Sequence, residues 1–222
     1  MAFEDYDEYE QGEQVRKWIK ENGIAVAVGV ALALALIFGW RQWQAHKANT
    51  EIQAASQFAV VQNAVQSGNK QAMGAALGDL QKNYAKSAYA AFASAAVAEY
   101  DVGKDDLKQA AQNLQWAVAN SSKQPALQSL FSLRLARVLL ADGKAQEALA
   151  ALGKVPSGDY AAMAAELRGD AQLKLGKADA ARTDYQDALA KLDKDAPGRS
   201  AVQMKLDNLT QPKAASTGKQ GQ

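Results

Sequence analysis

The sequence has no cysteine and only one histidine among its 222 residues, and both absences limit its chemistry. A chain without cysteine forms no disulfide, no thiolate zinc site and no thiol nucleophile. A Ser-His-Asp triad could use only His46, which follows a long apolar run and is better explained as a histidine at a membrane interface. Sequence motifs for phosphate binding, dinucleotide binding, zinc proteases and serine hydrolases are also missing. The residue inventory therefore predicts a protein that is not an enzyme and needs no cofactor or metal.

The sequence also lacks a strong excess of either charge, with 25 basic and 24 acidic side chains. Residues 1–23 hold 7 acidic and 3 basic side chains, and residues 41–222 hold 22 basic and 17 acidic ones. The excess of positive charge after residue 40 is mild and scattered, whereas nucleic-acid-binding domains gather their positive charge on one face. No nucleic-acid partner is expected.

The sequence does contain one long uncharged run, Ile24 to Trp40. As a helix rising about 1.5 Å per residue it spans roughly 26 Å, close to the roughly 30 Å of a bilayer's hydrocarbon core. Trp18 precedes the run, and Trp40 and Trp43 stand at its far end, as aromatic anchors at the two membrane interfaces would. We interpret residues 24–43 as a single transmembrane anchor.

Two alternatives to an anchor fit the sequence less well. A helix buried in a soluble core usually shows a polar seam, and this run has none. A cleaved signal peptide would have a short basic start, whereas residues 1–13 are acidic, and bulky residues follow the run where small ones should permit cleavage.

The orientation of the anchor is indicated by the basic residues beside it. Arg16, Lys17 and Lys20 precede the run, and Arg41 and Lys47 follow it. Because basic residues concentrate on the cytoplasmic side, this small difference favours a cytoplasmic N-terminus. The rest of the chain would then lie on the other side of the membrane.

Residues 1–23 precede the anchor and form an acidic tail followed by a short helix. With no apolar core to join, residues 1–13 are expected to be disordered, either as a solvated tail or as a docking segment for a cytoplasmic protein. Val15, Trp18 and Ile19 have the spacing of a short amphipathic helix at the interface. Asn22-Gly23 predicts a break before the anchor.

After the anchor, turn signals recur with a period typical of tetratricopeptide repeats. Gly68, Gly103, Gly143 and Gly176 lie 35, 40 and 33 residues apart, each between two alanine-rich helical segments. Glycine suits the left-handed position that ends a helix. Paired helices with a period near 34 predict an all-α protein, in which a single N-terminal transmembrane helix is followed by a tetratricopeptide-like helical repeat solenoid.

The fourth repeat is the clearest, because small residues flank its turn where two helices must approach. Gly169 lies seven residues before Gly176, and Ala181 lies five after it, followed by Tyr185 and Ala188. The third copy keeps Leu135, Ala136 and Ala148 at matching offsets, the second needs two extra residues before Ala110, and the first is barely recognisable. A capping helix is expected after Pro197-Gly198. The repeat domain is therefore predicted over residues 44–210, with a disordered tail over residues 211–222.

A helical repeat array offers a concave surface for partner proteins, normally lined by the first helix of each pair. These helices are predicted over residues 87–100, 127–141 and 161–175. Arg134 falls within an apolar stripe of the second one. It either extends to solvent, or pairs with an acid of a neighbouring helix, or binds a partner's carboxylate. The apolar candidates belong to the core unless they are exposed. The candidate partner-binding residues are Tyr89, Phe92, Phe131, Arg134 and Met163.

Several short strings occur in order between residues 13 and 209 and together resemble one known family. They are Glu21-Asn22-Gly23, Ala27-Val28-Gly29-Val30, Gly39-Trp40-Arg41 with Trp43, Leu133-Arg134-Leu135-Ala136-Arg137-Val138, Leu167-Arg168-Gly169-Asp170-Ala171, and Gln203-Met204-Lys205-Leu206 with Asn208-Leu209. In this order they resemble the YfgM family, the ancillary subunits of the bacterial SecYEG translocon.

The resemblance implies a single-pass protein of the bacterial inner membrane, with its repeat domain in the periplasm. The implied partners are the translocon channel subunits, the membrane-anchored periplasmic chaperone PpiD, and unfolded secretory or outer-membrane proteins passed on to periplasmic chaperones. An alternative role is a membrane-tethered scaffold or regulator of envelope complexes, including restraint of a stress regulator by the cytoplasmic tail. The family supplies no catalytic residues.

Overall fold

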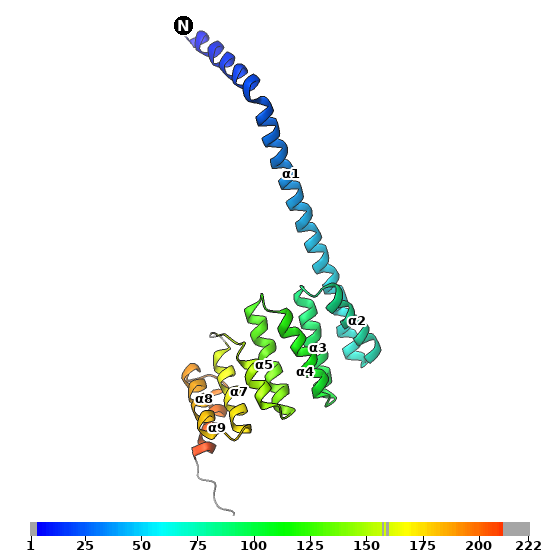
Figure 1. The fold of residues 1–222 in the computed structure, drawn as a ribbon, viewed down its shortest axis with the longest axis vertical. Coiled ribbons are helices and arrows are strands. Elements are labelled where there is room, and N and C mark those ends of the chain that lie inside the picture. Colours follow the sequence, from blue (N-terminus) through cyan, green and yellow to red (C-terminus); the bar gives the residue numbers. More distant parts are fainter. Residues whose placement is uncertain (1–3, 157, 159, 211–222) are drawn as a thin grey trace, which may run out of the picture. The chain divides into compact units, whose positions relative to one another are not determined.

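The computed structural model describes residues 4–156, 158 and 160–210, and the expected disordered tail over residues 211–222 lies outside them. The described residues form nine α-helices and no strand, so the all-α class is confirmed (Figure 1). The chain divides into two units after Ile52, so that α1 contributes to both. The helices are α1 (Glu4–Ser67), α2 (Lys70–Asn83), α3 (Ala88–Gly103), α4 (Leu107–Asn120), α5 (Pro125–Ala141), α6 (Ala145–Leu152), α7 (Ala161–Lys174), α8 (Ala178–Lys191) and α9 (Arg199–Thr210).

The first unit corrects two expectations about the N-terminal residues. Helix α1 begins at Glu4, so the described part of the acidic tail is helical rather than disordered. Asn22-Gly23 does not interrupt it, and the Asn22 side chain donates a hydrogen bond to the Trp18 carbonyl oxygen, 3.1 Å away, one turn earlier. A glycine inside a helix costs about 1 kcal/mol but leaves the backbone hydrogen bonds in place. The dipeptide is therefore tolerated within α1.

The apolar run within α1 is exposed along its length. The most apolar window of the helix has none of its residues buried, and Ile24, Leu36 and Phe38 are among the most exposed apolar side chains. A core helix of a soluble protein would bury these side chains against other elements. Their exposure is what a membrane-spanning helix requires, since its side chains face lipid.

The second unit contains successive helices packed side by side, as Figure 1 shows for α3 to α9. Helices α3 and α4 form one pair, α5 and α6 the next, and α7 and α8 the third, while the end of α1 joins α2 in a shared apolar cluster. The largest core cluster joins α3 to α7, and a smaller one holds α8 and α9. The tetratricopeptide-like array and its capping helix α9 are therefore present as predicted.

In each of the four pairs, one turn of the same type connects the two helices. In each, a residue in the left-handed region follows the first helix, at Gly68, Asp105, Gly143 and Gly176, with φ of 66°, 60°, 76° and 76°. The next amide donates to the carbonyl five residues earlier, at distances of 2.8 to 3.0 Å, which closes the turn as a Schellman motif. The prediction is confirmed for three glycines and wrong for Gly103, which lies within α3. Asp105 takes its place, because aspartate tolerates the left-handed conformation.

Counting from the left-handed residue brings all four repeats into register. Buried residues recur seven before it (Val61, Ala98, Ala136 and Gly169) and five after it (Met73, Ala110, Ala148 and Ala181). The second copy needed two extra residues before Ala110 only because it was counted from Gly103, and the left-handed residue, Asp105, lies two positions later. The first copy is hard to recognise from sequence because Val61 and Met73 replace the small residues at these positions.

At Gly169, α7 leaves no room for a Cβ beside the buried ring of Tyr185 on α8. The Tyr185 hydroxyl donates a hydrogen bond of 2.8 Å to Asp170, and burial followed by this bond raises the tyrosine's pKa. Lys205 on α9 donates to Glu166 and Asp170 at 2.7 and 2.8 Å. Burial lowers the pKa of Lys205, but the two carboxylates outweigh it and the net shift is upward. This network attaches the capping helix to α7.

Gly169→Ala is expected to destabilise the repeat domain. A Cβ at this position would lie 2.5 Å from Cδ1 and 3.0 Å from Cζ of Tyr185. Overpacking costs about 1–3 kcal/mol, which outweighs the roughly 1 kcal/mol that alanine contributes within a helix. Thermal unfolding of the full chain followed by circular dichroism measures the difference. Gly78→Ala in α2 is the matched control, since its Cβ meets no atom within 4 Å and alanine there should stabilise the protein.

The hydroxyl of Tyr185 is expected to make the domain sensitive to alkaline pH. Because the folded pKa is raised above the ordinary value of about 10, its contribution is present below pH 10 and is lost as pH rises further. Tyr185→Phe should cost about 1 kcal/mol at pH 8 through the lost hydrogen bond and flatten the fall in stability above pH 10. Unfolding measured between pH 8 and 11 tests this, with Tyr89→Phe as a surface control. An unchanged slope in Tyr185→Phe would contradict the assignment.

Candidate functional site

The apolar candidates for partner contact separate into exposed and buried residues. Tyr89, Phe92 and Met163 remain 36%, 37% and 38% exposed. Phe131 is fully buried and does not meet the condition of exposure. It lies in α5 within the main core cluster, and its ring meets the edge of Phe92 with centroids 5.8 Å apart. Phe92 therefore covers Phe131 and presents its own ring to solvent.

A groove of about 260 Å³ opens between α3 and α5, with α4 at its floor. Both walls come from first helices of neighbouring pairs, which is where the concave surface of the array was expected. Its lining is mostly apolar, with charged side chains at the rim. The lining residues are Ala95, Ala98, Glu99 and Val102 of α3, Leu114 of α4, and Arg134, Arg137 and Val138 of α5.

Arg134 and Arg137 lie three residues apart on α5, so both project from one side of the helix. Both are exposed, while the leucines, Ala136 and Val138 around them are buried. Neither arginine forms an ion pair with a carboxylate of the described residues, although Arg137 Nη2 lies 3.0 Å from the sulfur of Met163. Arg134 therefore has no acidic partner on a neighbouring helix, while its exposure fits the alternative in which the side chain extends to solvent.

The other three arginines of the repeat domain differ from this pair. Arg168 binds Asp184 and Asp187, each at 3.3 Å. Arg182 lies 2.6 Å from Asp179, and Arg199 donates to the carbonyl oxygens of α8 and the residue that follows it, at 2.7 and 2.8 Å. Among the arginines of the described repeat domain, Arg134 and Arg137 alone have no oxygen partner, so their hydrogen-bonding capacity is available to a ligand.

Sequence reasoning found Arg134 but missed Arg137, Glu99 and Val102. Arg137 follows Arg134 by one helical turn, so periodicity within α5 was a usable signal. Glu99 and Val102 belong to α3, and only the packing of the two helices places them opposite the arginines.

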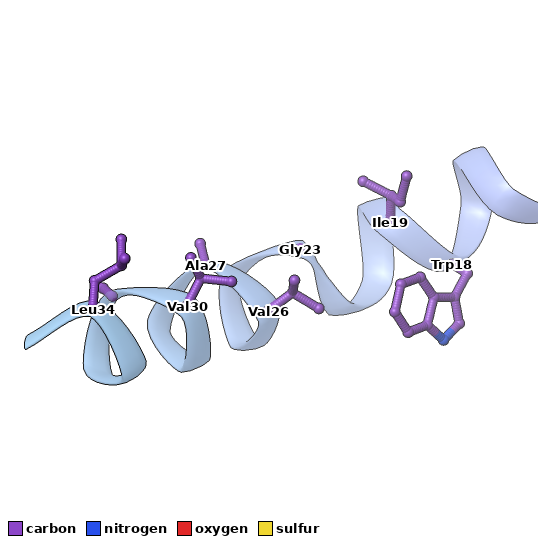
Figure 2. A pocket seen from close by; sticks show the side chains of 8 residues that line it. Trp18, Ile19, Gly23, Val26, Ala27, Val30 and Leu34 are labelled. Carbon is purple, nitrogen blue, oxygen red and sulfur yellow. The ribbon is translucent and has the colours of Figure 1, made fainter. Parts of the chain in front are cut away.

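The first unit has its own shallow groove along one side of α1. Gly23, Ala27 and Ala31 form a row of small residues at intervals of four, with the larger side chains of Val30 and Leu34 beside them. Figure 2 shows Val26, Val30 and Leu34 on successive turns, with Trp18 nearer the N-terminus. Small residues in such a row allow a second transmembrane helix to approach closely. The three tryptophans expected at the interfaces, Trp18, Trp40 and Trp43, are all exposed, and Trp40 and Trp43 are in ring contact.

The described residues contain no cluster of three or more His, Cys, Asp or Glu side chains that could hold a metal ion. The buried Asp101 on α3 accepts a hydrogen bond of 2.9 Å from Asn113 on α4. Burial raises the pKa of Asp101, and the bond from Asn113 opposes that shift only in part. This pair joins two helices of one repeat and lies apart from the groove lining.

Comparison with known proteins supports the architecture over nearly the whole chain. Residues 16–211 match the tetratricopeptide repeat-like domain family. Relatives from several bacteria carry the name Ancillary SecYEG translocon subunit. The Escherichia coli relative is 34% identical over 92% of this chain and 97% of its own length. The Haemophilus influenzae relative is 32% identical over 91% and 98%, and the Neisseria gonorrhoeae relative 33% identical over 87% and 89%. The chain therefore belongs to the YfgM family of ancillary SecYEG translocon subunits, as the order of its short sequence strings had indicated.

Proposed function

We propose that the protein is a non-enzymatic, membrane-anchored accessory factor of the Sec translocon. The observation that carries this proposal is that the anchor and the repeat domain both align with relatives named as translocon subunits, over nearly the whole length of the chain. The exposed apolar run of α1 supports a single span of the bacterial inner membrane. The basic residues before that run support a cytoplasmic N-terminus and a periplasmic repeat domain.

The partners proposed for the span are the translocon channel subunits. The row of small residues from Gly23 to Ala31 offers a face on which a neighbouring transmembrane helix can pack closely. Van der Waals contact between helices is the main driving force for such packing, because lipid tails are as apolar as the helix surface. The row therefore supports contact between the span and a channel helix.

The partners proposed for the repeat domain are unfolded secretory and outer-membrane proteins, which it helps to pass on to a membrane-anchored periplasmic chaperone similar to PpiD. The exposed Tyr89 and Phe92 of α3 and Met163 of α7 provide apolar contacts on the first helices of their pairs. Such contacts are individually weak. Anchoring beside a channel raises the local concentration of emerging chains to the millimolar range, where weak contacts suffice.

A second candidate function is a scaffold or regulator of envelope complexes that does not handle unfolded clients. One observation favours it: the large apolar side chains exposed on the first helices α3, α5 and α7 are few, and each is between 36% and 44% exposed. Surfaces that bind unfolded chains usually present larger apolar patches. In this role the cytoplasmic segment before the anchor would bind a regulatory protein, and the repeat domain would hold folded partners.

The orientation predicts the labelling of single cysteines, which this cysteine-free chain makes simple to introduce. Ser122→Cys places an exposed thiol in the loop between α4 and α5. An impermeant maleimide should label it in intact spheroplasts, because the repeat domain faces the periplasm. Ser121→Cys is the matched control, since Ser121 is only 2% exposed and should label slowly on either side. Labelling of Ser122→Cys only after lysis would place the domain in the cytoplasm.

Photo-crosslinking in cells is expected to separate the two candidate functions. A crosslinking side chain at Leu34, in the groove of the span, should form adducts with a translocon subunit. One at Phe92 should form adducts with exported proteins, whereas the buried position of Phe131 should form only internal ones. Mass spectrometry identifies the adducts. Translocon adducts without any exported protein at Phe92 would favour the scaffold, and absence of translocon adducts at Leu34 would contradict the proposed function.

A further inference from the structure

The unpaired arginines beside the α3–α5 groove point to a specific ligand group. A guanidinium group carries five N–H donors in a planar arrangement that matches a carboxylate, and it stays charged at any physiological pH. Arg134 and Arg137 stand about one helical turn apart, so both can reach one carboxylate between them. Met163, which Arg137 contacts, offers only a weak sulfur acceptor. A carboxylate therefore forms stronger hydrogen bonds with these arginines than the sulfur of Met163 does.

The remaining lining describes what accompanies that carboxylate. Ala95, Ala98 and the more exposed Val102 form the apolar part of the α3 wall. Leu114 of α4 and Val138 of α5 supply the apolar floor and the opposite wall. The groove of about 260 Å³ is lined mainly by alanine, valine and leucine and therefore accepts apolar side chains. Glu99 is the one acidic residue of the lining and forms no ion pair with the arginines, which leaves its oxygens free to accept backbone N–H groups of a bound strand.

Exposed apolar side chains flank the groove on more than one side. Tyr89 and Phe92 lie further toward the N-terminus of α3, and Met163 lies on α7 beyond Arg137. A bound chain can therefore gain contacts on both sides of the groove. This arrangement favours an internal stretch of polypeptide over a chain end, because a terminal carboxylate would leave one side of the surface unused.

We propose that the groove between α3 and α5 binds an extended, unfolded polypeptide segment at an internal Asp or Glu flanked by apolar residues. Arg134 and Arg137 bind the acidic side chain, and the alanine, valine and leucine lining accepts its neighbours. This inference rests on the proposed function, since it names the chemistry of the client segment that the repeat domain receives. It adds selectivity to a surface that apolar contacts alone would leave promiscuous.

Binding of labelled peptides to the full-length protein in lipid nanodiscs tests the inference. The probe is an amidated peptide of about nine residues with a central Asp between Ala and Val, measured by fluorescence anisotropy. A second peptide replaces Asp by Asn, and a third carries Asn and a free C-terminal carboxylate. The protein variants are R134E with R137E, which reverses both charges, and R134Q with R137Q, which removes them. Lys108→Glu, an exposed residue of α4 outside the lining, is the matched control.

The Asp peptide is expected to bind about tenfold more tightly than the Asn peptide, because a charged carboxylate forms stronger hydrogen bonds with guanidinium groups than a neutral amide does. Both double variants should lose this preference, Lys108→Glu should keep it, and added salt should weaken it. Equal binding of the Asp and Asn peptides, a preference that survives in the double variants, or no binding at millimolar peptide would overturn the inference. Tighter binding of the free-carboxylate peptide would also overturn it, by assigning the groove to chain ends.

Crosslinking from Leu34 distinguishes a failure of this inference from a failure of the proposed function. If the double variant R134E with R137E keeps its translocon adducts while the Asp preference is missing in the unmodified protein, the inference alone fails. If the unmodified protein forms no translocon adducts at Leu34, the proposed function fails whatever the peptides do.

Discussion

The repeat domain depends on close approach of its helices at two positions around each turn. In the second, third and fourth repeats, small side chains seven residues before the left-handed residue and five after it let neighbouring helices touch. The packing of one pair then creates the surface for the next. Gly169 is the extreme case, because the missing Cβ makes room for the ring of Tyr185. The hydroxyl of that ring then binds Asp170, which also holds Lys205 of the capping helix. The close packing at Gly169 thus positions the tyrosine whose hydroxyl joins the polar network at the end of the array.

Much of the fold could be predicted from sequence, because glycine at the turns and alanine at the crossings are direct consequences of backbone geometry. Three of the four turns follow the glycine rule, and the fourth does not, because Asp105 can adopt the same conformation as glycine. The helical N-terminus was missed for a different reason. A polar segment with no apolar partner gives no periodic signal, yet residues from Glu4 onward continue the helix of the anchor.

The candidate site was less predictable than the fold. Helical spacing placed Arg134 and Phe131 on one apolar stripe but could not tell a buried ring from an exposed one, and Phe131 is core. The residues that line the groove opposite Arg134 come from α3, more than thirty positions earlier in the chain. Their position follows from how α4 packs between α3 and α5. Such long-range proximity leaves no local pattern in the sequence.

The groove between α3 and α5 has a thermodynamic consequence, because its two walls belong to different repeats. In a linear array, cohesion between neighbouring repeats is a separate contribution to stability from the folding of each repeat. A ligand that touches both walls binds only when the two repeats are docked, so its binding free energy adds to the cohesion between them. Occupancy of the groove would thereby stiffen the array at one joint, and looser docking of the repeats would weaken ligand affinity by the same amount.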